Sequence, residues 1–230
     1  MKLATILTTV LFSSSLFAAD IMNFKLLGFS ADNKYVAFAE SVDMDGSGAG
    51  FASVSVVDVK GNNLVKRSNH TDQGADGDGS EAVALAQAIS KANLSSYGII
   101  QTKKGTLLLE RLATDLSTYR RTVFSQPPTL TSYALTLRQS AARSNACENG
   151  ESAKKLRLNL DSTRPQGHQV HLTMQNDTTL PASRGCVTGY AVSKVIKSGD
   201  ALVVVVSQTS TGFEGADIGH MLITAEVALD

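Results

Sequence analysis

The chain has 230 residues, and its 21 Lys and Arg residues balance 21 Asp and Glu residues, which gives a formal net charge of zero at pH 7. Proteins that bind nucleic acids usually present a basic face, so this balance argues against a nucleic acid as partner. Trp is absent and only 6% of the residues are aromatic, which leaves few of the aromatic platforms on which many sugar-binding proteins rely.

The first 19 residues have the pattern of a secretory signal. Lys2 precedes an apolar stretch, and small residues end the segment at Ala18 and Ala19. A charged start, an apolar middle and a small-residue end are typical of a signal that is cleaved on export, here after Ala18 or Ala19. The stretch is shorter than the roughly 20 apolar residues that cross a bilayer. A buried N-terminal strand is the alternative interpretation.

No later segment has the length and apolar character of a membrane span, and the most apolar one, residues 201–206, suits a buried strand. The composition shows no linker and no internal repeat. We therefore predict a signal peptide over residues 1–19 and one secreted, β-rich domain over residues 20–230, without a transmembrane segment in the mature protein. The location that follows is the periplasm or the cell exterior.

The first structural signal after the leader is a β-hairpin. Residues 34–42 and 51–59 are two apolar runs, and an Asp- and Gly-rich segment over residues 43–50 separates them. Two such runs around a turn-rich segment are typical of paired antiparallel strands.

The same turn segment also resembles half of a calcium-binding loop. Asp43, Asp45 and Ser47 place oxygen ligands at the first, third and fifth positions, and Gly48 follows at the sixth. The twelfth position, where a bidentate Glu is required, is Val54. A hairpin turn is therefore favoured over a site for calcium, which stays open as the weak cofactor alternative.

One helix is predicted, toward the end of the first half of the chain. Ser80 suits the N-cap, Glu81 suits the first turn, and the helix is expected to end near Tyr97 and Gly98. One apolar face is expected to contain Ala82, Leu85, Ala86 and Ile89. The polar, glycine-rich stretch over residues 68–79 is predicted to be a mobile loop.

The second half reads almost entirely as strands. Apolar and polar residues alternate around Tyr133, Leu135 and Leu137, around Leu156, Leu158 and Leu160, and around Val170, Leu172 and Met174. Residues 187–196 and 202–207 predict a further hairpin, and residues 221–227 predict the last strand. Such alternation is the habit of antiparallel sheets with one buried face. We therefore predict a mainly β fold: antiparallel sheets in a sandwich or a partly open barrel, with one packed α-helix.

The two cysteines, Cys147 and Cys186, predict a disulfide bond. An isolated pair in an exported protein is oxidised more often than it binds metal, because a structural zinc site needs four ligands in close pairs. Two separate buried thiols are the alternative.

Sequence motifs for catalysis are scarce. The chain lacks the Gly-x-Ser-x-Gly nucleophile elbow and the phosphate-binding Gly-x-x-x-x-Gly-Lys loop. Ser152 and Lys155 fit a Ser-x-x-Lys pattern, but its companion motifs are missing and a chance match is expected. We predict no catalytic residue from these patterns.

Two regions resemble a family of predicted secreted bacterial proteins of unknown function. The first is the hairpin over residues 28–59, and the second covers residues 186–227 with its Gly212-Phe213-Glu214-Gly215-Ala216-Asp217 stretch. The resemblance implies secretion and carries no activity. Glu214 and Asp217 are a candidate carboxylate pair in a cleft, although turn and loop hydrogen bonds explain them more simply.

The leading functional hypothesis is a non-catalytic binding or envelope-associated protein of the periplasm, with an envelope component or another protein as partner. A hydrolase that uses Glu214 and Asp217 is the second hypothesis. A calcium-stabilised extracellular module that uses Asp43, Asp45 and Ser47 is the third.

Overall fold

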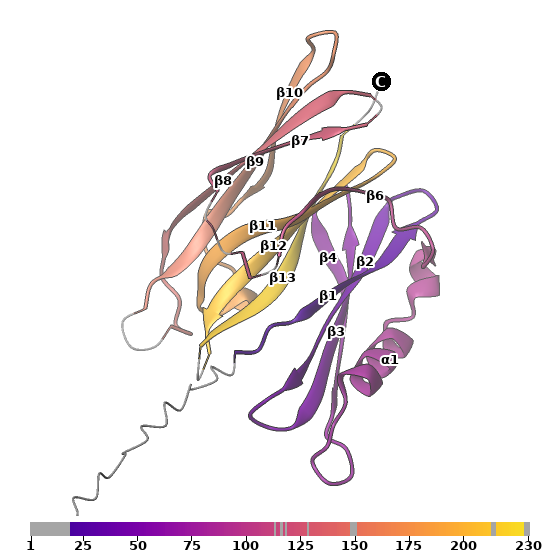
Figure 1. The fold of residues 1–230 in the computed structure, drawn as a ribbon, viewed down its shortest axis with the longest axis vertical. Coiled ribbons are helices and arrows are strands. Elements are labelled where there is room, and N and C mark those ends of the chain that lie inside the picture. The colour runs from indigo at the N-terminus through magenta and orange to yellow at the C-terminus, as the bar shows by residue number, and fades with distance from the viewer. Residues whose placement is uncertain are drawn as a thin grey trace, which may run out of the picture.

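The computed structural model describes residues 19–227 apart from residues 113, 116, 118, 128, 148–150, 213 and 214 (Figure 1). This part of the chain forms three antiparallel sheets, one α-helix and two 3-10 helices. The helices are α1 (Glu81–Ala92), η1 (Leu94–Tyr97) and η2 (Ala182–Arg184). The strands are β1 (Asn23–Ser30), β2 (Tyr35–Met44), β3 (Ala49–Asp58), β4 (Asn63–Asp72), β5 (Ile99–Ile100), β6 (Thr106–Glu110), β7 (Arg121–Gln126), β8 (Thr131–Ala142), β9 (Ala153–Thr163), β10 (Gln169–Asn176), β11 (Val187–Ser198), β12 (Ala201–Thr211) and β13 (Ala216–Glu226).

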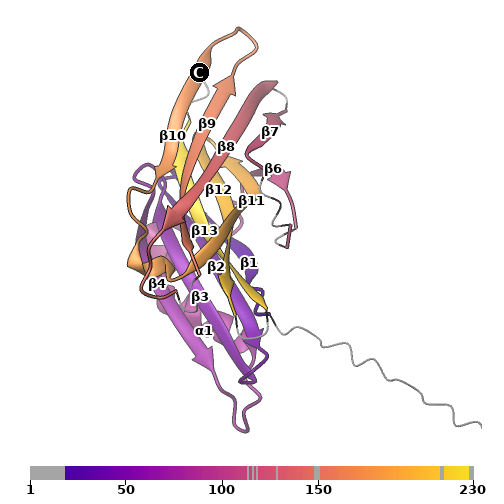
Figure 2. The ribbon, with the colours of Figure 1, turned by 90° about the vertical axis from the view of Figure 1, so that its left-hand side faces the viewer.

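The sheets stack as layers, and α1 covers the outside of the first layer (Figure 1). The N-terminal sheet has the order β4-β3-β2-β1-β5 and packs with its other face on the central sheet, β13-β12-β11-β6. The outer sheet, β10-β9-β8-β7, packs on the opposite face of the central sheet (Figure 2). The prediction of antiparallel sheets with one packed helix is confirmed. No sheet in the described ranges closes on itself into a barrel, so the sandwich is the alternative that agrees with the structure.

Strand β12 shows why its sequence is an uninterrupted apolar run. One face of the strand packs on the N-terminal sheet through Ala201, Val203 and Val205. The other face packs on the outer sheet through Leu202, Val204 and Val206. A strand between two layers needs apolar side chains on both faces, so the predicted buried strand is confirmed.

Helix α1 turns a different face to the sheet from the one predicted. Its fully buried residues are Ala84, Ala88 and Ala92, which recur at helical spacing, while Leu85 and Ile89 pack at the border. Ala82 and Ala86 are exposed. The opposing sheet face is itself rich in alanine, with Ala37, Ala39 and Ala52. Small side chains on both surfaces let the helix approach closely, and larger side chains then pack beside the contact.

The start of α1 is capped by other segments and not by Ser80, whose side chain makes no capping hydrogen bond. Asp43, near the end of β2, accepts a hydrogen bond from the Glu81 N–H at 2.5 Å. Asp72 accepts one from the Ser80 N–H at 2.9 Å. Carboxylates suit this end because the first N–H groups of a helix have no partner within it.

The predicted mobile loop over residues 68–79 is wrong in its first part. Residues 68–72 belong to β4, which pairs along its length with β3. The strand is polar because it forms the edge of its sheet, where a strand pairs through its backbone without an apolar sequence. Among the described helices, none combines the length and the apolar character that a membrane crossing requires.

Candidate functional site

The candidate site lies where the inward-facing positions of β8 and β9 in the outer sheet change from apolar to polar side chains. The inward face of β8 runs through Leu135 and Leu137 to Gln139, and that of β9 runs through Leu158 and Leu156 to Lys154. The leucines are buried in the core, whereas Gln139 and Lys154 are half-buried. The period of two continues past the core edge, and it carries polar groups to a position where leucines would otherwise extend the core.

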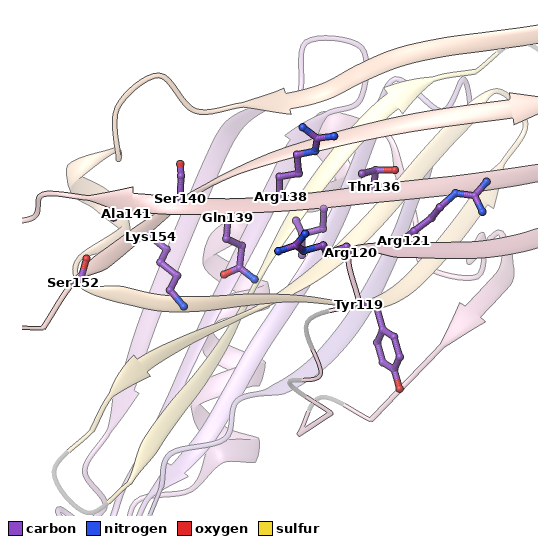
Figure 3. Close-up of a pocket in the computed structure, with 11 residues that line it drawn as sticks. Tyr119, Arg120, Arg121, Thr136, Arg138, Gln139, Ser140, Ala141, Ser152 and Lys154 are labelled. Carbon is purple, nitrogen blue, oxygen red and sulfur yellow. The ribbon is translucent and has the colours of Figure 1, made fainter.

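A hollow of about 720 Å³ opens at this place. We call it the basic groove, and its charged lining is Arg120, Arg121, Arg138 and Lys154. Tyr119, Gln139 and Ser152 also line it, and no Asp or Glu does among the residues that the structure describes. Figure 3 shows Gln139 and Lys154 pointing to one side of β8, while Arg138 and Ser140 point to the other.

The four cations of the groove have no partner within the part of the chain that the structure describes. Salt bridges there involve other basic residues, namely Lys60, Arg184, Lys194, His171 and His220. The charge is also concentrated in the sequence, since residues 119–158 contain seven Lys and Arg against two Asp and Glu. A neutral chain thus carries a local positive field, which attracts anions to this surface.

Gln139 fixes one wall of the groove to the central sheet. Its side-chain amide donates to the Tyr190 carbonyl oxygen at 2.9 Å and accepts from the Tyr190 N–H at 3.0 Å. An amide side chain offers both a donor and an acceptor, so it satisfies both backbone groups of an unpaired strand position. The contact links β8 to β11 beyond the place where β6 ends its pairing with β11.

The Tyr190 side chain fixes the other wall. Its buried hydroxyl donates to the Lys154 carbonyl oxygen at 3.0 Å and accepts from the Arg184 guanidinium at 3.3 Å. Burial raises the pKa of the Tyr190 phenol above its usual value, so the group stays neutral and keeps its proton for this bond. Arg184 in turn forms a two-pronged ion pair with the buried carboxylate of Asp177.

The disulfide bond closes the far end of the same region. The structure pairs Cys147 with Cys186, as the sequence predicted, with a Cα–Cα distance of 4.8 Å. Cys147 lies after β8, and Cys186 directly precedes β11. Ser144 adds a hydrogen bond from its hydroxyl to the Gly185 carbonyl oxygen at 2.8 Å. The outer and central sheets are therefore cross-linked beside the basic groove.

The residues of the calcium hypothesis lie in and beside the turn between β2 and β3, and two of them make hydrogen bonds that stabilise the fold. Asp43 caps α1, and the Ser47 hydroxyl accepts from the Ala49 N–H at 3.3 Å. Residues 45–48 form the turn between β2 and β3, as the hairpin interpretation predicted. Within the described ranges, no three His, Cys, Asp or Glu side chains converge as metal ligands. Calcium binding by Asp43, Asp45 and Ser47 stays a prediction.

Of the predicted carboxylate pair, Glu214 and Asp217, the structure describes only Asp217, because Glu214 lies outside the described residues. Asp217 stands in β13 and accepts a hydrogen bond from the Asp20 N–H at 3.1 Å. This contact supports the simpler interpretation of Asp217 as an anchor. Ser152 and Lys155 do not form a pair either, because the Lys155 ammonium donates to the Thr178 carbonyl oxygen at 2.9 Å.

The basic groove was not predicted, because its cations come from three separate segments that only the fold brings together. A signal was present in the two strand patterns. Leu135 and Leu137 lead to Gln139, and Leu158 and Leu156 lead to Lys154, at the same parity. A polar residue that continues an apolar face marks the end of a core and the start of a wet surface.

Comparison with known proteins places the chain in a family without a known activity. No curated protein matches it at a significant level. The sequence family described as predicted secreted protein (DUF2259) matches residues 37–226, which run from β2 to the end of β13. This match confirms the resemblance that residues 28–59 and 186–227 suggested. The chain belongs to the DUF2259 family of predicted secreted proteins, whose function is unknown.

Proposed function

We propose that this protein is a non-catalytic binding protein outside the cytoplasm, and that it holds an anionic partner in the basic groove. One observation supports the proposal above the others. Arg120, Arg121, Arg138 and Lys154 line a common hollow without a carboxylate among them and without partners in the described part of the chain. Four unneutralised cations in one concave surface repel one another, and an anion that fills the surface relieves this repulsion.

The chemistry of the lining favours binding over catalysis. Arginine guanidinium groups and a lysine ammonium donate hydrogen bonds to carboxylate or phosphate oxygens. Within the described ranges, the lining contains no His, Asp, Glu or Cys, which are common proton-transfer groups and nucleophiles of enzymes. The groove therefore offers recognition of negative charge from several directions.

Export completes the proposal. Membership in a family of predicted secreted proteins agrees with a cleaved signal over residues 1–19, and the Cys147–Cys186 bond suits an oxidising compartment. We place the mature protein, residues 20–230, in the periplasm, where an envelope component or an exported protein supplies the anion.

Hexaglutamate with a fluorescent label and blocked ends is a suitable probe for the groove. We expect it to bind the mature protein, with a change in fluorescence anisotropy, at low ionic strength. Binding should weaken when salt rises from about 25 to about 200 mM, because exposed charges are screened. The double variant Arg120→Glu, Lys154→Glu should weaken binding about tenfold or more, since it replaces two attractions by repulsions.

The matched control is Lys25→Glu, Lys66→Glu, which makes the same change in net charge on β1 and β4 of the N-terminal sheet. The central sheet separates that layer from the outer sheet. This control should retain most of the wild-type affinity. Equal losses in both double variants would show that only the net charge matters, and the groove would then not be the binding site.

A further inference from the structure

The basic groove follows an open edge of the outer sheet. Strand β7 pairs with β8 only over residues 131–136. Strand β8 continues to Ala142, and β9 remains its partner on the other side to the end. The hollow is lined by every residue from Leu137 to Ala141, so it borders the edge of the strand and not one face alone.

The direction of the unpaired backbone groups follows from one hydrogen bond. The Leu137 N–H donates to the Arg120 carbonyl oxygen at 3.0 Å, which continues the ladder between β7 and β8 by one residue. Backbone groups alternate sides along a regular strand, and β8 has no bulge against β9 over residues 132–142. The N–H and C=O groups of Gln139 and Ala141 therefore point to the open side, where no described backbone group bonds them.

The side chains around this edge leave it accessible and charged. Gln139 turns its amide inward to Tyr190, so it secures the neighbouring β11 and does not cover the β8 edge. Lys154 lies on the inward side of β8 and Arg138 on the outward side (Figure 3). A strand laid along the edge would send alternate side chains to both sides, and each side would meet a cation.

We infer that the open edge of β8 receives an extended acidic segment of a partner protein, which adds to the outer sheet as a strand beyond the start of β7. This inference rests on the proposed function and names the form of its anion. Unpaired backbone groups at a sheet edge are a template for a further strand. The free length, residues 138–142, is about 17 Å at the usual rise per residue, which matches a short peptide segment.

The test separates backbone pairing from charge alone. The probes are labelled hexaglutamate, the same peptide with N-methyl groups at alternate residues, and a polyacrylate oligomer of equal charge that has no amide backbone. We expect hexaglutamate to bind about tenfold more tightly than both comparison probes, because only it can complete the ladder. Hydrogen exchange at the Gln139 and Ala141 amides should slow about tenfold or more on binding.

A variant removes the edge donor and leaves all four cations in place. Ala141→Pro deletes an N–H on the open side, where proline is tolerated in edge strands, while Ala141→Val retains it. Hexaglutamate should bind more weakly to the proline variant and normally to the valine variant, and polyacrylate should bind both equally. Circular dichroism and urea unfolding would establish that both variants are folded.

Each contrary result has a distinct meaning. Equal binding of all three probes, unchanged by Ala141→Pro, would overturn strand addition and leave the anion-binding proposal standing. Absence of binding for every probe would overturn both. If sedimentation shows that the free protein is a dimer and Ala141→Pro makes it monomeric, a second copy occupies the edge and the inference of a partner protein is wrong.

Discussion

Tyr190 connects the core to the groove at the level of a single residue. Its side chain is buried and holds the Lys154 backbone, and its own backbone is held by Gln139. Arg184 donates a hydrogen bond to the hydroxyl, and Asp177 holds Arg184 in place through an ion pair. Two lining residues from different strands are thus held by one core residue, Tyr190, which binds Lys154 through its side chain and Gln139 through its backbone. If the groove binds a partner as proposed, walls held in this way should lower the entropy lost on binding.

Lys197 is a buried cation whose protonation affects stability. Its side chain lies between layers and donates to the Val227 carbonyl oxygen at 3.1 Å. Burial lowers the pKa of the Lys197 ammonium below its usual 10.5, although nearby Asp200 opposes the shift. Between the lowered pKa and 10.5, the unfolded chain keeps a proton that the folded chain has released. The free energy of unfolding should therefore rise with pH in this interval.

We expect Lys197→Met to remove this pH dependence. In urea unfolding at a series of pH values, wild type should gain stability relative to the variant as pH rises from neutral toward 10.5. Lys66→Met, on the edge strand β4, is the control, because it should run parallel to wild type. Parallel curves for wild type and Lys197→Met would contradict the role of burial.

At the level of elements, the sequence predicted strands best where packing is simple. The alternation of β8 and β9 and the apolar run of β12 follow directly from one or two buried faces. Strand β4 was missed because an edge strand pairs through its backbone. The prediction of the buried face of α1 was wrong in part, because the helix lies so close to the sheet that the small residues Ala84 and Ala88 occupy the contact.

The candidate site was less predictable than the fold. Its cations are separated by up to 34 positions, from Arg120 to Lys154, and only the pairing of β7, β8 and β9 joins them. The disulfide was predictable because cysteine chemistry and compartment decide it without knowledge of the fold. The sequence around Asp43 did not predict its contact with α1, since a helix that is distant in the sequence supplies the N–H group.

The disulfide should contribute strongly to stability, because it joins two sheets through a loop of 39 positions. In the chain-entropy model, closing a loop of this length is worth about 4 kcal/mol. We expect Cys147→Ser, Cys186→Ser to lower the free energy of unfolding in urea by about this amount. Dithiothreitol should destabilise wild type to the same degree and leave the double variant unchanged. A loss below about 1 kcal/mol would contradict the prediction.

At the level of the whole molecule, the three sheets differ in how far their faces are covered. The central sheet is covered on both faces and forms the structural interior, while α1 closes the N-terminal sheet. The outer sheet has one face turned away from the central sheet, and the unpaired cations gather beside the end of β8 that β7 leaves without a partner. A partner strand would lengthen the outer sheet without disturbing the other layers. The arrangement therefore allows binding without a change in the core.

The predicted cleavage of residues 1–19 would change how the chain begins in the folded protein. The Ile218 N–H donates to the Asp20 carbonyl oxygen at 3.0 Å, and the Met22 N–H donates to the Ile218 carbonyl oxygen at 2.9 Å. The Asp20 N–H donates to Asp217. Cleavage after Ala19 would turn this N–H into a charged amino group beside the Asp217 carboxylate, and the hydrogen bond would gain an ion pair.

We therefore expect the protein recovered from a periplasmic extract to begin at Ala19 or Asp20 and to lack two hydrogens because of the disulfide. Intact-mass measurement and N-terminal sequencing would establish both points in one sample. The control is a chain that lacks residues 1–19 and is produced in the cytoplasm, where the thiols should stay reduced. Recovery of the full-length chain from the extract, with residues 1–19 still attached, would contradict cleavage.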